Sequence, residues 1–153
     1  MDYEDRIQAL GLELPPAPKP VGSYRPLLET QRFAFLSGQI SKTADGKILA
    51  GKVGKDLTLE QGQAAARAAA LNVASVIRNL LGFEKFGRFL RVVGYVQTAP
   101  DFYEIPQVLN AASDLLVEVF GENGSHARTA VGMASLPLNA AVEIEVTLEL
   151  KGK

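Results

Sequence analysis

An arginine and a glutamate near the C-terminus are the residues of this chain whose types and spacing suit chemistry on a small anion. Arg128 lies in a run of small residues, and Glu143 is the second residue of an alternating segment further along. A guanidinium binds a carboxylate through two parallel N–H bonds, and a held carboxyl group can move a proton. The two residues predict a site for a small carboxylate. A purely structural ion pair of Arg128 with Glu143 or Glu145 is the alternative.

Both residues fall in segments that are typical of β-strands. Residues 142–150 alternate strictly between apolar and polar side chains, so Glu143 must point away from the hydrophobic core. Residues 126–131 form a second expected strand of small residues. One face of that strand carries His126, Arg128 and Ala130. With a turn between them, the two strands predict a hairpin that brings Arg128 and Glu143 to neighbouring positions on one surface.

The rest of the chain mixes strand and helix patterns. A capping box at 58–61 opens a long alanine-rich helix, and an amphipathic pattern predicts a second helix. The order β-β-(β)-α-β-α-β-β predicts an α+β sheet with both helices packed on one face. The expected helices are residues 2–10, 59–81 and 105–120, and the expected strands before the C-terminal pair are 24–30, 32–38, a short or extended segment at 48–53, and 89–98.

Length and composition are those of an ordinary globular protein. The chain has 153 residues, 47% of them hydrophobic and 22% charged, which suits one domain. We expect an N-terminal helix and Pro-rich connector over residues 1–20, then a single domain over residues 21–153. The start of the chain lacks the basic and apolar blocks of a signal peptide, and no apolar run reaches membrane-spanning length. A cytoplasmic protein without a membrane anchor is the expectation.

Several classes of chemistry are disfavoured by the residue counts. The absence of cysteine excludes disulfides and thiolate catalysis, and a single histidine makes a zinc site improbable, so no metal is expected. The formal net charge of −1, with scattered lysines and arginines, gives no electrostatic reason to expect nucleic-acid binding.

The expected sheet leaves one face without a covering layer. We expect Arg128, Gln97, Glu143 and Glu145 there, mixed with small and apolar residues. Such a surface is too apolar for free solvent and too polar for a monomer's core. Self-association in closed symmetry is the simplest way to cover it.

Four short sequence motifs occur in order along residues 18–150. The first is Gly22-Ser-Tyr24, and the second is Leu36-Ser-Gly38-Gln-Ile40. The third is Asn110 within Val-Leu-Asn-Ala. The fourth combines Ala-Arg128-Thr-Ala-Val, Leu-Pro and Val-Glu143-Ile-Glu. Together, the four motifs resemble the RidA/YjgF family of enamine/imine deaminases, which also has this interval between its arginine and its glutamate. Residues 98–106 form a longer segment than in the commonest members.

The resemblance implies a fold, an assembly and an activity. The fold is chorismate-mutase-like, with three subunits around a threefold axis and clefts between neighbours. The activity is hydrolytic deamination of small carboxylate-bearing imines or enamines to a keto acid and ammonia, without a metal or an organic cofactor. Members are also described as endoribonuclease L-PSP or translation inhibitors.

The resemblance also assigns roles to residues. Arg128 would bind the substrate carboxylate with help from the backbone N–H of Gly38, and Glu143 would orient water and move protons. Tyr24 would close the cleft from the neighbouring subunit, and Asn110 would face the cleft. The structural alternatives are an interface aromatic for Tyr24 and an ordinary polar helix position for Asn110.

Two residues depart from the family pattern. Ala130 replaces a common cysteine, which changes the shape of the pocket more than the mechanism. His126 replaces a common proline; it either lines the cleft and titrates near neutrality or is a loop-edge residue without a role. These departures leave open a trimer that binds a small carboxylate metabolite without turnover. A ribonuclease or translation inhibitor ranks last.

Overall fold

Five strands and three α-helices build the fold. The computed structural model describes residues 1–19 and 22–152. The strands are β1 (Leu27–Glu29), β2 (Phe33–Ile40), β3 (Phe86–Gln97), β4 (Ala127–Met133) and β5 (Val142–Leu150). The α-helices are α1 (Tyr3–Ala9), α2 (Leu59–Val76) and α3 (Ile105–Phe120), and three short helical segments are η1 (Ile77–Leu81), η2 (Gly121–Gly124) and η3 (Pro137–Asn139).

The strands form one mixed sheet in the order β1-β2-β5-β3-β4. Strand β3 pairs with β4 in parallel and with β5 in antiparallel fashion. Helix α3 lies between β3 and β4 in sequence, so these elements form a βαβ unit. Strands β1 and β4 are the two edges of the sheet.

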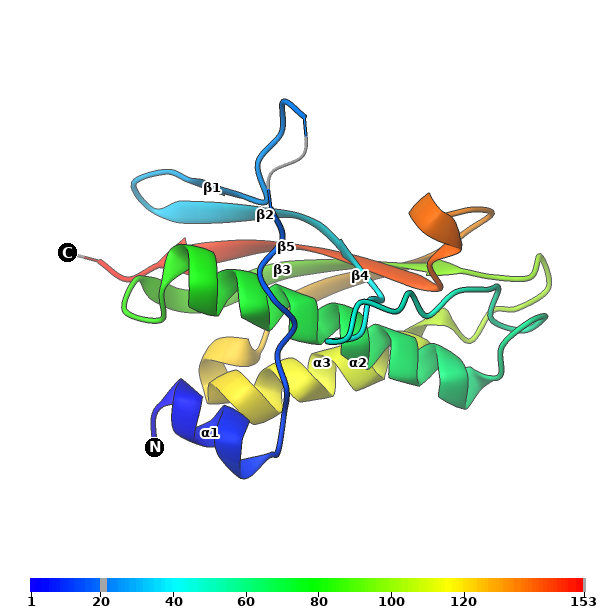
Figure 1. The fold of residues 1–153 in the computed structure, drawn as a ribbon, viewed down its shortest axis with the longest axis horizontal. Helices are drawn as coiled ribbons and strands as arrows, with labels where there is room; N and C mark the ends of the chain where they lie inside the picture. Colours follow the sequence, from blue (N-terminus) through cyan, green and yellow to red (C-terminus); the bar gives the residue numbers. More distant parts are fainter. Residues whose placement is uncertain (20–21, 153) are drawn as a thin grey trace.

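Helices α2 and α3 cover one face of this sheet, as expected (Figure 1). Small side chains let α2 approach the strands closely, and its alanines at positions 65, 66, 69 and 70 are fully buried. Gly94 of β3 permits a similar approach by α3, because a Cβ there would lie 2.6 Å from Leu109 Cδ2. The α+β class, with both helices packed on one face, is therefore confirmed.

The long expected helix over residues 59–81 changes its hydrogen-bond pattern near its end. Helix α2 stops at Val76 and continues as the π-helical segment η1 to Leu81. Gly82, with φ 88°, ends it. The helix expected over residues 105–120 has the predicted limits. Residues 48–53 form isolated bridges at Ile48, Ala50 and Val53 instead of a strand.

The predicted C-terminal hairpin is wrong. Strands β4 and β5 do not pair, because β3 lies between them and pairs with both. The crossover through α3 returns the chain parallel to β3 and leaves β4 at the edge, and η3 then leads to the far side of β3. A sequence pattern of strand, turn and strand shows that two strands exist, but it does not show which strand each one pairs with.

The N-terminal segment packs against the helical layer. The ring of Tyr3 in α1 lies 5.3, 5.6 and 5.1 Å from those of Phe83, Phe86 and Phe120. The connector after α1 is extended, as predicted, and runs across the helices toward the sheet (Figure 1), where the Pro15 carbonyl accepts a hydrogen bond from the Ser75 hydroxyl. Its predicted last residue, Pro20, lies outside the described residues.

The second face of the sheet has no covering layer in this chain. Glu143 and Glu145 point to this face, as predicted, together with Tyr95 and the partly exposed Phe35. Gln97 is instead only 2% exposed, because loops cover it: its amide donates to the Gly51 carbonyl and the Asn139 side chain. None of the helices within residues 1–19 and 22–152 is long and apolar enough to cross a membrane.

Candidate functional site

Arg128 lies on edge strand β4 and points to the helix side of the sheet. Its backbone pairs with Val92, a core residue on that face. Its Nη1 donates to Asn110 Oδ1 at 2.9 Å and to Ser113 Oγ at 3.2 Å. Asn110 and Ser113 come from successive positions on one face of α3. The guanidinium is therefore held between the helix and the strand.

His126 and Ala130 lie on the same side as Arg128, as the sequence predicted. His126 Nε2 is 2.9 Å from Ser113 Oγ, and Nδ1 is 2.6 Å from the Gly124 carbonyl. Ala130 is half-buried against the core beside Gly94, its partner on β3. Ser113 is a site residue that the sequence motifs did not indicate. Its place one helical turn from Asn110 was the available signal.

Glu143 and Gly38 form a second group, on the opposite face of the sheet. Glu143 pairs with Tyr95 on β3 and with Ile40 on β2. A Cβ at position 38 would overlap the Glu143 carboxyl group, with 2.9 Å to its Cδ. Glycine is therefore required at position 38 for Glu143 to occupy this place, which gives the Ser-Gly-Gln motif a physical reason.

The surroundings of Glu143 favour its protonated form. Burial is the largest cause of the raised pKa of this carboxyl group, and the negative charge of Glu145 adds to it. Glu145 is itself held in place by a hydrogen bond from the Tyr95 hydroxyl. A carboxyl group whose pKa is raised toward neutrality is suited to give and take a proton.

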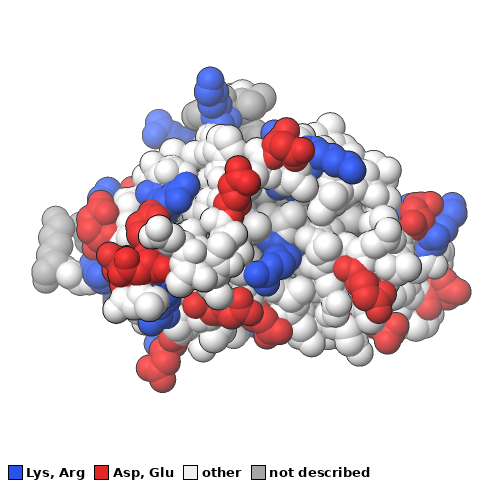
Figure 2. Space-filling view, turned by 60° about the horizontal axis from the view of Figure 1, so that its bottom comes forward, with Lys and Arg blue, Asp and Glu red and all other residues white. Residues whose placement is uncertain are grey.

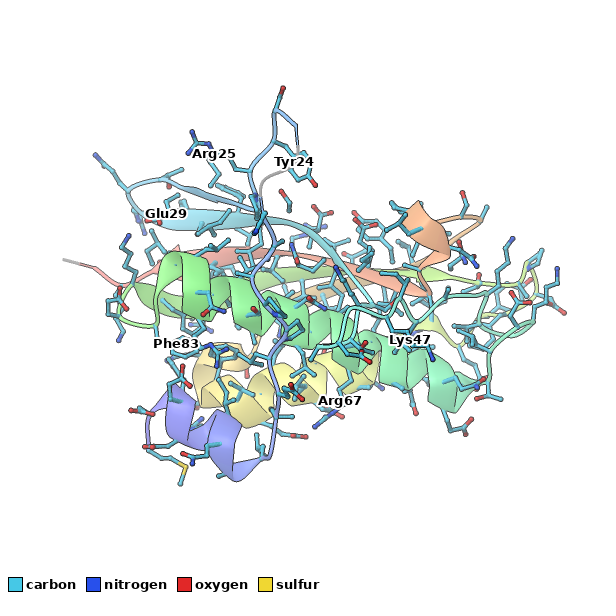
Figure 3. The ribbon with its side chains drawn as sticks, in the orientation of Figure 1. Tyr24, Arg25, Glu29, Lys47, Arg67 and Phe83 are labelled. Carbon is cyan, nitrogen blue, oxygen red and sulfur yellow. The ribbon has the colours of Figure 1, made fainter. Side chains whose placement is uncertain are left out.

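Tyr24 and the Glu143 group line one cavity of 790 Å³. The loop that carries Tyr24 projects on the side of the sheet opposite the helices (Figure 3), and Tyr24 is 61% exposed. Gly38, Lys42 and residues 15–19 of the connector also line this cavity. Its mixed apolar and polar lining has room for a small organic molecule.

One chain therefore does not bring all the predicted residues together. Arg128, Asn110, His126 and Ala130 form the first group at the β4 edge, and Tyr24, Gly38 and Glu143 form the second group on the other face. The prediction that Arg128 and Glu143 are neighbours on one surface is wrong for a single chain. Arg128 was also expected on the uncovered face of the sheet. It lies on the helix side instead, because side chains alternate along a strand and the residues on either side of Arg128 point to the uncovered face.

The charged side chains of the described residues bear on metal binding and on nucleic-acid binding. Over residues 1–19 and 22–152, no group of three or more His, Asp or Glu side chains is placed to hold a metal ion. Acidic and basic side chains alternate on the face seen in Figure 2, with no continuous basic stripe. The formal net charge of the whole chain is −1.

Comparison with known proteins places the chain in a family. The family model described as "YjgF/chorismate_mutase-like, putative endoribonuclease" matches residues 4–150. The chain belongs to this YjgF/RidA family, and its five-stranded mixed sheet with three helices is a YjgF-like fold.

Individual relatives are similar to this chain over most of its length. Protein TCP17 of Trypanosoma cruzi is 42% identical over 146 residues, which cover 94% of this chain and 91% of that protein. A solved structure from Shewanella oneidensis, described as a "putative endoribonuclease", is 34% identical with a TM-score of 0.90, covering 98% of this chain and 100% of its own. The Atu1372 protein of Agrobacterium tumefaciens, whose function is given as unknown, is 36% identical with a TM-score of 0.88, covering 97% and 94%.

Proposed function

We propose that this protein hydrolyses small carboxylate-bearing imines or enamines to a keto acid and ammonia, in clefts between the subunits of a homotrimer. The observation that carries the proposal is the division of the predicted site into two groups on opposite faces of the sheet. Each group is well formed, yet neither is complete. A neighbouring chain that brings its second group to the first group of this chain would complete the cleft.

The first group is suited to bind a carboxylate. The Nη1 atom of Arg128 is engaged by Asn110 and Ser113, which leaves the Nε and Nη2 donors. These donors form a fork that matches the two oxygens of a carboxylate. The edge position of β4 keeps this fork accessible to a ligand at the boundary between two chains.

The second group is suited to proton transfer during hydrolysis. Water adds to the imine carbon, the imine nitrogen gains protons, and the C–N bond breaks to release ammonia. When protonated, the carboxyl group of Glu143 would donate to the nitrogen, and as carboxylate it would accept a proton from the attacking water; its raised pKa makes the protonated form more accessible. Tyr24, from the same cavity, would hydrogen-bond the substrate or the water.

The direct test is an imine-decay assay. An amino-acid oxidase generates 2-imino acids from several amino acids, and their decay is followed with and without the protein. We expect the wild type to accelerate decay and Arg128→Ala to reduce kcat/KM by about 100-fold or more, the loss of a charged, bidentate contact. No acceleration with any side chain would exclude the proposed activity. A thermal shift with 2-oxo acids in that case would indicate binding without turnover.

A mixing experiment tests whether the cleft is shared between chains. Arg128→Ala and Glu143→Gln chains are each expected to be inactive, so they are co-expressed in equal amounts. A shared cleft is functional when an intact Arg128 meets an intact Glu143, which random assembly gives in about a quarter of clefts. Recovery of about a quarter of wild-type activity supports the shared site. No recovery from mixed oligomers verified by mass spectrometry would place both groups in one chain's site.

RNA cleavage is the second candidate, favoured by the endoribonuclease descriptions of the family and of the Shewanella relative. The interspersed charges on the face in Figure 2 give it little support. RNA degradation that persists through purification and disappears in Arg128→Ala would reverse the order of the two candidates.

A further inference from the structure

A chain of hydrogen bonds links Arg128 to the single histidine of the sequence. Arg128 Nη1 donates to Ser113 Oγ at 3.2 Å, and Ser113 Oγ is 2.9 Å from His126 Nε2. His126 Nδ1 is in turn 2.6 Å from the Gly124 carbonyl oxygen. These hydrogen bonds run from strand β4 to helix α3 and back to the turn before β4.

The direction of each hydrogen bond follows from chemistry. A carbonyl only accepts, so His126 Nδ1 carries a hydrogen and donates to Gly124. In the neutral imidazole Nε2 is then an acceptor, and the Ser113 hydroxyl donates to it. A guanidinium only donates, so the remaining lone pairs of Ser113 accept from Arg128. Ser113 therefore donates to neutral His126 and accepts from Arg128 at the same time.

The imidazole lies in surroundings that favour this neutral form. Burial is the largest cause that lowers the His126 pKa below its usual value, and the positive charge of Arg128 acts in the same direction; the Gly124 carbonyl acts against them. Helix α3 presents Ser113 to the imidazole, and β3 presents the ring of Phe89, with centroids 6.3 Å apart. Arg128 is thus the charged residue that acts on His126.

Protonation of His126 would rearrange this chain of hydrogen bonds. His126 Nε2 would then donate to Ser113 Oγ, and the Ser113 hydrogen would have to turn away. Two positively charged donors, His126 and Arg128, would converge on one oxygen. An anion bound to Arg128 would relieve this arrangement, because it neutralises the positive charge nearest to the imidazole.

We propose that Ser113 and His126 are positioning residues that aim the free Nε and Nη2 donors of Arg128 at the substrate carboxylate, and that protonation of His126 and carboxylate binding at Arg128 favour each other. This inference rests on the proposed function, which places a carboxylate at Arg128. The inference goes further because it gives a role to His126, which stands where the family commonly has proline. It also predicts that carboxylates bind more tightly at lower pH. By thermodynamic linkage, a carboxylate that raises the His126 pKa must bind more tightly to the protonated form.

The single histidine makes the coupling measurable without assignment. The imidazole C–H resonances are titrated by NMR with and without 2-oxobutanoate, a carboxylate of the product class. We expect the ligand to raise the His126 pKa, and its affinity, measured separately by calorimetry, to be about fivefold higher below that pKa than above it. Binding of 2-oxobutanoate that leaves the His126 titration unchanged would contradict this coupling. Absence of any binding by 2-oxobutanoate and of any imine hydrolysis would instead remove the proposed function on which it rests.

Variants of Ser113 distinguish a role in positioning Arg128 from a role in fold stability alone. Ser113→Ala is expected to raise KM for imino acids by about tenfold, more than it lowers kcat, and to weaken the pH dependence of affinity, because His126 and Arg128 no longer share one oxygen. Ser113→Thr keeps the hydroxyl and should restore both. If Ser113 only stabilises the fold, Ser113→Ala will lower the melting temperature but leave KM and its pH dependence as in the wild type. This result would contradict the proposal.

Discussion

At the scale of single residues, the chain modifies two ionisable side chains by different means. Glu143 is held close to Gly38 on the uncovered face of the sheet, where burial and Glu145 raise its pKa. His126 is held behind Arg128, where burial and a positive neighbour lower its pKa. In both cases burial favours the uncharged form, which is the protonated carboxyl group for Glu143 and the neutral imidazole for His126.

Substitution of Glu145 tests the electrostatic part of the Glu143 shift. Glu145→Gln removes a negative charge but keeps an oxygen that can accept from Tyr95. The pKa of Glu143 should fall, because its ionised form loses a repulsive neighbour. The protonated carboxyl group then disappears at lower pH, so the decline of kcat/KM that follows its ionisation should shift to more acidic pH.

The measurement is the pH profile of kcat/KM for imine hydrolysis. Glu149→Gln is the matched control, since Glu149 lies on the same strand and does not contribute to the Glu143 shift. An identical profile in Glu145→Gln and the wild type would show that Glu143 ionisation does not limit the reaction.

At the scale of elements, the close contact between β3 and α3 positions the first group. Asn110 and Ser113 reach Arg128 because α3 lies directly on the sheet beside Gly94. The sequence predicted α3 at its observed limits, because a long amphipathic pattern is a local property. It did not predict that β3 separates β4 from β5, because strand pairing depends on contacts between distant segments.

Gly94→Ala is expected to disturb this contact. The added methyl group would overlap the side chain of Leu109, whose Cδ2 lies 2.6 Å from the Cβ position, and overpacking of this kind costs about 1–3 kcal/mol. Chemical denaturation should show that loss. Gly152→Ala, where no atom lies within 4 Å of the new methyl, should stay within about 0.5 kcal/mol of the wild type. Equal stability of the two variants would mean that the contact between Gly94 and Leu109 leaves room for a methyl group.

At the scale of the whole molecule, the aromatic residue of α1 joins the N-terminus to the core. Tyr3 contacts three phenylalanine rings, and its hydroxyl accepts a hydrogen bond from Asn123 at 3.0 Å. Phe83, labelled in Figure 3, lies at the end of the helical layer next to α1. The sequence predicted this helix from its spacing of apolar residues, but not the phenylalanines that receive it, since these come from residues 83–120.

Tyr3→Ala should therefore destabilise the entire fold and not only fray its end. We expect a loss of about 2–3 kcal/mol in the free energy of unfolding, since a partly buried aromatic ring with edge contacts is removed. Tyr103→Ala, at a position that is 80% exposed, is the matched control and should change stability by less than about 0.5 kcal/mol. Thermal unfolding followed by circular dichroism measures both, and equal curves for the two variants would contradict the role of α1.

The placement of Arg128 and Glu143 on opposite faces of one sheet has a consequence for enzyme assays. If each cleft is shared, an isolated chain holds two half-sites, and catalysis requires encounter with another copy. Specific activity would then fall on dilution below the dissociation constant of the assembly, and the rate would rise more steeply than linearly with protein concentration in that range. The amount of active enzyme in a cell would be set by the abundance of the chain as well as by its folding.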